Sequence, residues 1–306
     1  MDAFADLLTG LRTEGAVLGR SALPSPCALR FVGGAPLTLC TLLDGQGWIV
    51  AGDGTRMRIR AGDSVVVRGP EPFVFTDDPA DLRPDLITEV ACADVADQPG
   101  SACAVDPEAP ATLLVGECPL RGETGKRLLS ALPPLVFAAA DPDCEGAVRY
   151  LAEEVATARP GHQVVLDRLL DWLLVCTLRA WFDDPERNAP AWYRALGDPV
   201  VGTALRRMHD APNHPWTLAA LARSAGVSRA TLAKRFTDLV GEPPLTYLTG
   251  WRMTLAADLL ADTSMAIGDV ARRTGYADGF GFSSAFKRTK GMSPTAYRAA
   301  RSFSRV

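Results

Sequence analysis

Basic side chains gather at two places near the end of this 306-residue chain, and their natural chemistry is to contact a polyanion. The first group is Arg229, Lys234 and Arg235, and the second is Lys287 and Arg288. Lysine and arginine bind phosphate oxygens, and they also reach the acceptor atoms of guanine in the major groove of DNA. The residue types therefore predict a nucleic-acid interface.

The charge of the chain is distributed unevenly. From residue 199 onward there are 15 Lys+Arg and 7 Asp+Glu, a net charge of +8, whereas the first 198 residues hold 17 and 29, a net charge of −12. The formal charge of −4 for the whole chain hides this asymmetry. A basic segment attached to an acidic body places the polyanion-binding surface in the C-terminal third.

The same third contains an internal repeat. Ala222 and Gly226 recur 49 residues later as Ala271 and Gly275. Five further residues recur 50 positions later, namely Leu232, Phe236, Gly241, Pro244 and Tyr247, which match Phe282, Phe286, Gly291, Pro294 and Tyr297. A repeat of this length indicates one supersecondary unit that is used twice.

Each unit is predicted to be a helix, a glycine-containing turn and a second helix. Ser228 and Asp278 are suitable N-caps for the two second helices, and apolar residues at helical spacing continue their inward faces. Basic residues stand on the outward faces. Two helices joined by a short turn, with an outward basic face on the second, form the arrangement that enters the DNA major groove.

At these residues the chain resembles the AraC/XylS family of bacterial transcription regulators. The resemblance rests on the paired units, on FKR at Phe286–Arg288 and on GMSPTAYR at Gly291–Arg298. It implies two helix-turn-helix units bridged by one long helix, here predicted over 245–261. About 17 residues give a helix of ~25 Å, which is shorter than the ~34 Å repeat of B-DNA. We therefore expect that the DNA bends or that only one unit seats fully.

The resemblance also implies which side chains meet the DNA. The positions that usually meet bases fall on Ala230, Ala233 and Lys234 in the first unit and on Phe280 and Ser284 in the second. Alanine methyls suit thymine methyls and lysine suits guanine, whereas the glycines around Phe280 weaken the start of the second helix. The second unit is thus expected to discriminate bases poorly and to rely on shape and backbone. The predicted DNA-binding set is Arg229, Ala230, Thr231, Ala233, Lys234, Arg235, Arg273, Gly279, Phe280, Ser284, Lys287 and Arg288.

The N-terminal half reads as β-structure. Six short apolar segments separated by Gly, Asp and Pro lie between residues 29 and 90, and residues 61–70 resemble a turn of cupin proteins. We predict a multidomain chain, with an N-terminal antiparallel β-barrel (cupin-like) plus helices and a C-terminal all-α double helix-turn-helix. The expected domains are a cupin-like effector-sensing domain over 1–140, a helical dimerisation or coupling segment over 141–184, a linker over 185–198 and the double helix-turn-helix over 199–306.

The barrel is predicted to be a sensor rather than a catalyst. The chain has three histidines, His162, His209 and His214, and all of them lie outside the strand region. A histidine-based metal site in the barrel is thereby excluded, and we expect no metal, no cofactor and no enzyme activity. A cupin enzyme fused to a DNA-binding tail and an architectural DNA binder without effector are the rival interpretations.

Two kinds of signal could be sensed. A small organic ligand would occupy the barrel against the predicted inward residues Leu39, Thr41, Trp48, Val50 and Phe73. Alternatively, some members of the resembled subgroup respond to oxidants through cysteines in this half, for which Cys92, Cys103 and Cys118 are the candidates. Ligand sensing is the favoured hypothesis.

The expected partners are double-stranded DNA, a small-molecule effector, a second copy of the chain and RNA polymerase. A predicted helix over 164–182 is apolar over more than one stripe, which fits either a homodimer contact or core packing. No run of 18 apolar residues appears and the N-terminus lacks the pattern of a signal peptide. We therefore expect no membrane association and a cytoplasmic location.

Overall fold

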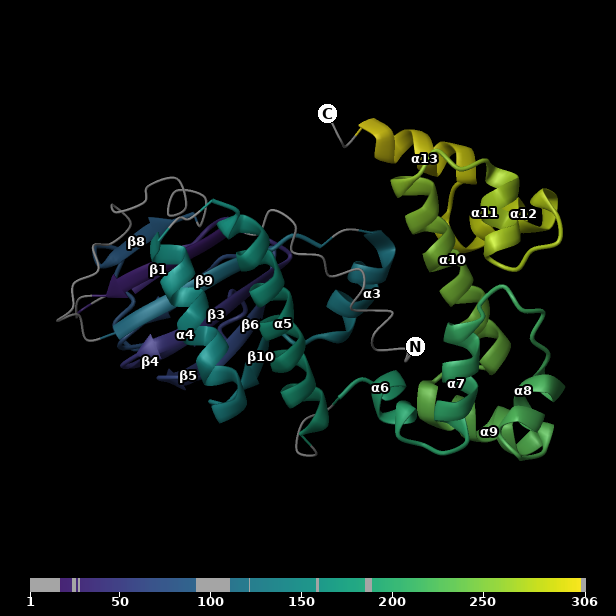
Figure 1. Ribbon diagram of the computed structural model, residues 1–306, viewed down its shortest axis with the longest axis horizontal. Helices are drawn as coiled ribbons and strands as arrows, with labels where there is room; N and C mark the ends of the chain where they lie inside the picture. Colours follow the sequence, from purple (N-terminus) through teal and green to yellow (C-terminus); the bar gives the residue numbers. More distant parts are fainter. Residues whose placement is uncertain are drawn as a thin grey trace. The chain divides into compact units, whose positions relative to one another are not determined.

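The chain folds as two compact units in this computed structural model, which describes residues 17–23, 26, 28–91, 111–120, 122–157, 160–184 and 189–303 (Figure 1). The N-terminal unit contains residues 11–120 and 129–188. The C-terminal unit contains residues 189–306 together with 121–128. A short piece from the middle of the chain therefore packs with the C-terminal helices.

The N-terminal unit is built on two five-stranded sheets. The first has the order β1 (Val17–Leu23), β9 (Ala111–Cys118), β3 (Leu37–Asp44), β6 (Ser64–Arg68) and β10 (Leu135–Ala138). The second has the order β5 (Arg56–Arg60), β4 (Gln46–Val50), β7 (Phe73–Thr76), β2 (Ala28–Phe31) and β8 (Ile87–Val90). All neighbours are antiparallel except β2 and β8, which run parallel. The six predicted strand segments are β2 to β7, so the sequence pattern located them correctly.

Strand β3 shows why this region is so apolar. Cys40 and Leu42 belong to the core cluster between the two sheets, together with Phe75 of the opposite sheet. Leu39 and Thr41 alternate with them and are just as buried, on the other face of the strand. A strand covered on both faces loses the alternation of apolar and polar residues, which explains the continuous run LTLCTLL.

The expected barrel is an open sandwich instead. In the described part of the chain, no strand of the first sheet pairs with a strand of the second, so each sheet keeps two edges. Alternating strands separated by turn residues are common to barrels and sandwiches, because both are antiparallel layers around one core. The sequence pattern therefore predicted the positions of the strands correctly, but it did not show whether the sheets close into a barrel.

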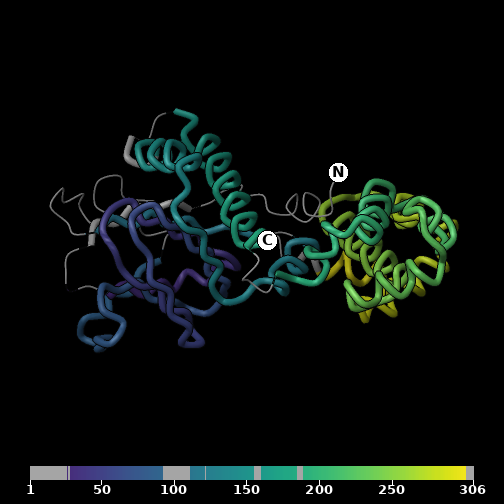
Figure 2. Tube along the Cα trace, turned by 90° about the horizontal axis from the view of Figure 1, so that it is seen from below, coloured from purple at the N-terminus to yellow at the C-terminus, as the bar shows by residue number. Residues whose placement is uncertain are grey.

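Two helices cover the outer face of the first sheet. Helix α4 (Pro142–Thr157) and helix α5 (His162–Asp183) pack on each other, and both contact strands of this sheet. In Figure 2 both helices lie on one side of the strands. The predicted helix over 164–182 buries a long apolar face, while Val164 and Trp172 are exposed. Core packing thus accounts for most of its apolar residues.

The C-terminal unit is all helical. Its helices are α6 (Ala191–Leu196), α7 (Val201–Asp210), α8 (Leu218–Ser224), α9 (Arg229–Val240), α10 (Pro244–Asp262), α11 (Ile267–Arg273), α12 (Gly279–Lys290) and α13 (Pro294–Phe303), joined by α3 (Gly122–Ala131). Helix α6 falls within the interval 185–198 that was expected to be a linker, and its Ala195 is fully buried. That interval is therefore partly a folded element of the C-terminal unit.

Helix α10 connects two separate cores. Tyr247 and Leu248 near its start join the core of α6 to α9, whereas Ala256 and Leu260 near its end join the core of α11 to α13. The predicted bridging helix is thus present over 19 residues, or about 28 Å. Because both cores share this helix, the two helix-turn-helix units are held by one continuous element.

The predicted caps of the two second helices are confirmed. Ser228 accepts a hydrogen bond from the N–H of Thr231 at 3.1 Å, and Asp278 accepts one from the N–H of Gly281 at 2.7 Å. Both helices end at a glycine with positive φ, Gly241 at 91° and Gly291 at 78°. Other residues adopt this left-handed conformation at a cost, so the glycines fix where the helices stop.

Replacing Ser228 by alanine is expected to lower the free energy of unfolding by about 1 kcal/mol, because the first turn of α9 then loses its side-chain acceptor. Urea unfolding followed by circular dichroism measures the change. Ser284→Ala on the exposed face of α12 is the matched control, with an expected change within about 0.5 kcal/mol. Equal effects of the two variants would show that the cap does not stabilise α9.

Candidate nucleic-acid interface and ligand cavity

Helix α9 is amphipathic, with one apolar face packed in the core and a polar face exposed to solvent. Leu232 and Phe236 are fully buried in the first core. The predicted contact residues Arg229, Ala230, Thr231, Lys234 and Arg235 are all exposed, and Ala233 is half-buried. The structure therefore brings the predicted set of the first unit together on one helix, on the side away from the core.

Helix α12 repeats this arrangement with a different surface. Phe282 and Phe286 are fully buried, while Ser284, Lys287 and Arg288 are exposed. Its most unusual residue is Phe280, whose side chain is 85% exposed in the first turn. A large apolar side chain left in water on the same helix as the exposed Lys287 and Arg288 is typical of a binding surface, because exposure costs hydrophobic free energy that a partner can recover.

The exposed cations are not equivalent. Four exposed cationic side chains form no hydrogen bond or ion pair with another described residue, namely those of Arg229, Arg273, Lys287 and Arg288. By contrast, Arg235 donates two hydrogen bonds to the Asp198 carboxylate, at 2.8 and 2.6 Å. We infer that the four unpaired cations are the better phosphate ligands and that Arg235 has a structural role.

Asp198 links this arginine to helix α7. The same carboxylate accepts hydrogen bonds from the N–H groups of Val200 and Val201, both at 2.9 Å. Burial alone would raise the pKa of Asp198, but the hydrogen bonds from Arg235, Val201 and Val200 outweigh it and lower the pKa. The carboxylate therefore stays ionised and holds Arg235 against the start of α7.

A contact that the sequence did not predict joins α3 to the bridging helix. The Asp258 carboxylate of α10 accepts hydrogen bonds from the N–H groups of Glu123 and Thr124, at 2.5 and 3.2 Å, and from Thr124 Oγ1 at 2.5 Å. It therefore caps the N-terminus of α3 from 134 to 135 residues away. Gly122 has φ 79°, and a Cβ there would lie 2.6 Å from Asp258 Oδ1. Glycine thus permits the close approach.

The side chain of Glu123 continues the contact to α12 and α13. Its carboxylate lies 2.8 Å from Lys290 Nζ and accepts a hydrogen bond from Tyr297 Oη at 3.1 Å. Both partners of the ion pair are only 17% exposed. Burial raises the pKa of Glu123, but hydrogen bonds and charge from Lys126 and Lys290 outweigh this and lower the pKa to about 2. The Lys290 ammonium is therefore engaged within the protein.

The pKa of Glu123 predicts a pH-dependent stability. Because the folded-state pKa is depressed, its contribution is fully present above the unfolded-state value near pH 4.5 and is lost as the pH falls toward 2. We expect Glu123→Gln to lower the free energy of unfolding by on the order of 2 kcal/mol at pH 7, less than the full pKa shift implies because solvent screens this partly exposed group, and the difference from wild type to vanish only below pH 2. Urea unfolding at several pH values measures this.

Glu242→Gln serves as the control for this experiment. The Glu242 side chain makes no hydrogen bond or ion pair with another described residue, so its neutralisation is expected to change stability by less than about 0.5 kcal/mol at every pH. A pH-independent difference between Glu123→Gln and wild type would contradict an ionic role of Glu123.

The N-terminal unit contains a cavity of about 620 Å³ between the first sheet and helices α4 and α5. Apolar side chains supply much of its lining, and they come from strand ends and from both helices: Leu42, Leu43, Ala138, Ala139, Ala140, Val148, Ala152, Leu173 and Ala180. Cavities that hold drug-sized molecules have volumes of roughly 300–1,000 Å³. This one is large enough for a small organic ligand.

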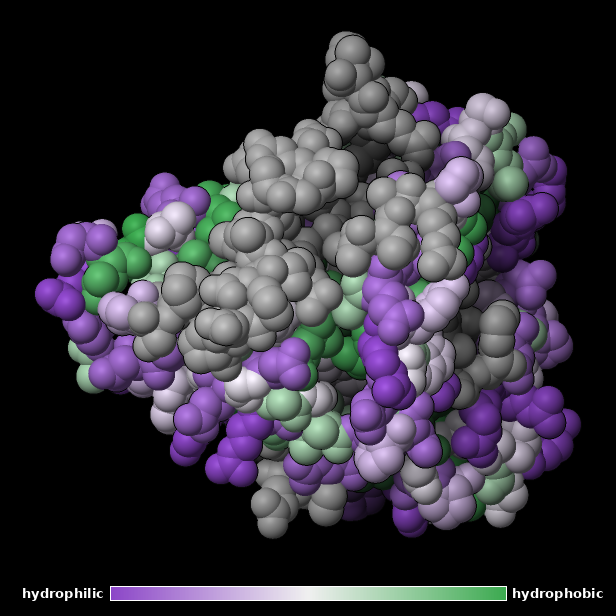
Figure 3. Space-filling model, turned by 60° about the vertical axis from the view of Figure 1, so that its left-hand side comes forward, coloured by the Kyte–Doolittle hydropathy of each residue, from purple (hydrophilic) through white to green (hydrophobic). Residues whose placement is uncertain are grey.

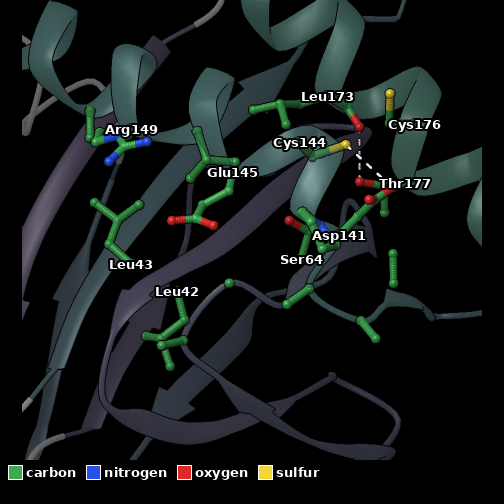
Figure 4. A pocket seen from close by; sticks show the side chains of 18 of the residues that line it. Leu42, Leu43, Ser64, Asp141, Cys144, Glu145, Arg149, Leu173, Cys176 and Thr177 are labelled. Atoms are coloured by element: carbon green, nitrogen blue, oxygen red, sulfur yellow. Dashed lines mark hydrogen bonds between the residues drawn. The ribbon is translucent and has the colours of Figure 1, made fainter.

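The charged groups of the lining are mostly acidic. Asp44, Asp141, Glu145 and Glu153 line the cavity, and Arg149 is the one cation among the described lining residues. In Figure 4 the Glu145 carboxylate points into the cavity. It has no hydrogen bond or ion pair with another described residue. Asp141, by contrast, accepts a hydrogen bond from the N–H of Asp143 at 2.9 Å and so caps the start of α4.

The five residues predicted to line an effector pocket are not brought together. Phe73 lies in the core between the sheets and borders a space of only about 10 Å³, which holds at most one water molecule. Leu39 and Thr41 face the other side of β3, where Thr41 Oγ1 lies 2.9 Å from Ser64 Oγ. None of the five borders the cavity beneath α4 and α5.

The thiol alternative is not supported. Cys118 is 1% exposed, and burial followed by the charge of Asp171 raises its pKa to about 12, so that it stays a protonated thiol. Cys92 and Cys103 lie outside the described residues. Cys118 is therefore a buried apolar side chain rather than an accessible nucleophile.

Two of the three histidines have structural contacts in the C-terminal unit. His209 is buried, with Nε2 2.8 Å from Tyr247 Oη and its ring 4.4 Å from that of Trp251. The His214 ring lies 4.3 Å from that of Trp216.

Within the described ranges, no group of three or more His, Cys, Asp or Glu side chains is arranged to hold a metal ion. None of the described helices is both long and apolar enough to span a bilayer. The surface shown in Figure 3 is largely hydrophilic, with apolar areas between.

Comparison with known proteins agrees with these two units. A cupin family model matches residues 2–183, and a helix-turn-helix domain model matches residues 221–300. The DNA-binding domain of AdpA, a global transcriptional factor solved in complex with a target DNA, is 32% identical, covers 34% of this chain and 93% of that chain, and has a TM-score of 0.33. The second model covers both repeats.

Several similar proteins are named as transcription regulators. An AraC-like transcription regulator of Streptomyces lividans is 39% identical over 175 residues, which are 56% of this chain and 58% of that protein. The HTH-type transcriptional regulator AlkR of Acinetobacter baylyi is 34% identical over 183 residues, 57% of this chain and 58% of that protein. The chain thus spans less than two thirds of each relative. The chain therefore belongs to the cupin family through residues 2–183, carries a helix-turn-helix domain over residues 221–300, and is similar to AraC-like transcription regulators.

Proposed function

We propose that the protein binds DNA sequence-specifically to regulate transcription, and that its N-terminal unit senses a small-molecule effector. The observation that carries the DNA-binding part is the pair of capped helices, α9 and α12, each with a buried apolar face and an exposed face that includes unpaired cations. The cores beneath both helices include residues of α10, so this one helix positions both recognition helices.

The two helices would read DNA in different ways. On α9, Ala230 and Ala233 suit thymine methyls and Lys234 suits guanine, although Lys234 must first release Asp238, which lies 2.9 Å away. That pair is largely exposed, so its loss costs little. On α12, Phe280 can contact a thymine methyl or a base step, and Lys287 and Arg288 can bind phosphates. The second unit would then depend more on DNA shape than on base identity.

The length of α10 has a consequence for the DNA. About 28 Å of helix is shorter than the ~34 Å that separates equivalent major-groove faces. If both units seat, the DNA must bend toward the protein, which costs of order 1–6 kcal/mol for a site of 20–30 base pairs. A bend is therefore expected in any complex that both units engage.

Footprinting on the DNA upstream of the protein's own gene tests this proposal. We expect a protected site of roughly 20 base pairs, two segments of major-groove contact and an affinity that falls steeply with salt. The Phe280→Ala protein should protect mainly the segment bound by the first unit. Absence of protection on promoter DNA at low salt would contradict the proposed function.

The route from effector to DNA is proposed to run through α3. Strands β9 and β10 belong to the N-terminal unit, whereas α3 between them in sequence packs on α10, α12 and α13 of the C-terminal unit. Strand β10 follows α3 directly and continues into residues 138–142, which line the cavity. Displacement of this segment by a ligand would therefore pull on the helix that Asp258 and Lys290 hold. The expected homodimer and a contact with RNA polymerase stay predictions.

A further inference from the structure

We propose that the cavity beneath α4 and α5 binds an amphiphilic organic cation, a molecule with an apolar body and one protonated amine or quaternary ammonium group. This inference deepens the effector sensing of the proposed function. It names the site, which differs from the residues predicted from the sequence, and the chemical class of the ligand.

The apolar part of the ligand is indicated by the floor of the cavity. Leu42 at the end of β3 and Leu173 of α5 are buried, and Val148 and Ala152 of α4 face them across the space. The two hydroxyl groups of the lining are already used, because Ser64 Oγ pairs with Thr41 Oγ1 at 2.9 Å and Thr177 Oγ1 donates to the carbonyl of Leu173 at 2.9 Å. A ligand body that needs few hydrogen bonds therefore suits this floor.

The cationic head is indicated by the charge of the lining. Four carboxylates against one guanidinium make the space attractive to a positive group and repel an anion. The Asp141 carboxylate is already used to cap α4, whereas the Glu145 carboxylate is exposed, makes no hydrogen bond within the described structure and so is available to a ligand. Glu145 is thus the residue expected to pair with the ligand.

Two alternatives explain the acidic residues less completely. Glu145, Arg149 and Glu153 stand four residues apart on α4, a spacing that would allow a ladder of ion pairs on a solvated helix face. Yet Arg149 pairs with neither carboxylate among the described contacts. An anionic ligand bound by Arg149 would have to lie beside Glu145 one turn away, which Figure 4 shows at the same cavity.

Three probes with the same body separate these possibilities. Isothermal titration calorimetry of the full chain at pH 7 compares phenylbutylamine, phenylbutanol and phenylbutyrate, which carry a cationic, a neutral and an anionic head. We expect the amine to bind about 2- to 5-fold more tightly than the alcohol, the increment of one charge pair at an exposed carboxylate. The carboxylate is expected to bind more weakly than the alcohol.

Variants test the assignment to this cavity. Glu145→Gln should bring the affinity for the amine down to that for the alcohol and leave the alcohol unchanged. Asp143→Asn, in the same turn of α4 but outside the lining, should leave all three affinities unchanged. Ala139→Trp places a bulky side chain at an exposed position of the lining and should abolish binding of all three probes.

The outcomes distinguish this inference from the proposed function. Equal affinities for the three probes, a preference for phenylbutyrate, or no binding of any probe would each overturn the cation assignment. DNA footprinting of the same preparation without ligand reports on DNA binding independently. If the protein protects promoter DNA but binds none of the probes, the proposed ligand of the cavity is wrong and the proposed DNA binding still stands.

Discussion

Replacing Arg229, Arg273, Lys287 and Arg288 together by glutamine is expected to lower the affinity for a DNA site by roughly two to three orders of magnitude near physiological salt. Each phosphate contact releases about 0.9 counterion from B-DNA, so the slope of log K against log salt should fall by about 3 to 4. The four side chains have no ion pair to other described residues, so their loss should leave the fold unchanged.

A salt titration of binding, followed by fluorescence anisotropy, measures both quantities. The matched control replaces four arginines of the N-terminal sheets, Arg30, Arg56, Arg58 and Arg60, which removes the same charge from the other unit. The control is expected to change the slope by less than one unit. Equal slopes for the two quadruple variants would show that net charge, and not this surface, governs binding.

Arg235 provides a contrast within the same helix. Its guanidinium is bound to Asp198, whose carboxylate is also held by two backbone N–H groups of α7. Breaking this pair leaves a partly buried carboxylate without its main partner, so stability should suffer more than the salt slope. Position on a recognition helix is therefore insufficient to assign a phosphate contact.

The sequence predicted the C-terminal unit well for a physical reason. Its caps, turns and apolar stripes are local signals, and the repeat presents them twice, so the sequence alone predicts Ser228 and Asp278 as N-caps, and both side chains accept the expected hydrogen bonds. The shared helix α10 was implied by the resemblance to the AraC/XylS family, which placed a bridging helix over 245–261, and it extends over Pro244–Asp262.

The cavity and the α3 contact could not be predicted in the same way. Asp258 and Thr124 are 134 residues apart, and nothing local in GETGK shows that a distant carboxylate will cap it. The cavity depends on how α4 and α5 lie over the first sheet, a tertiary arrangement that periodicity does not encode. The prediction of the pocket residues was wrong for a related reason. Strand β3 is buried on both faces, so its sequence pattern does not show which side chains face a ligand.

The sequence does contain one local signal for the α3 contact, the glycine at position 122. A glycine before an acidic helix start, GET at residues 122–124, indicates a backbone that approaches another group closely. The sequence does not name that group, but the glycine marks the segment as one that can dock against another part of the chain.

Replacing Asp258 by alanine is expected to destabilise the protein by about 3 kcal/mol and to undock α3. The N–H groups of Glu123 and Thr124 and the Thr124 hydroxyl all lose their acceptor, and each orphaned donor costs about 1–3 kcal/mol while it stays buried. The net cost is smaller than the sum for two reasons. Undocking lets water satisfy the donors, and removal of the carboxylate relieves the burial that raises the pKa of Asp258.

Urea unfolding gives the stability, and hydrogen exchange of the α3 amides reports its docking. Asp238→Ala, which removes an exposed carboxylate of α9, is the control and should change stability by less than about 0.5 kcal/mol. If α3 couples the cavity to the DNA reader, the Asp258→Ala protein should bind DNA with an affinity that no longer responds to cavity ligands. Unchanged exchange protection of α3, or an intact response with α3 undocked, would show that the signal reaches the recognition helices by another route.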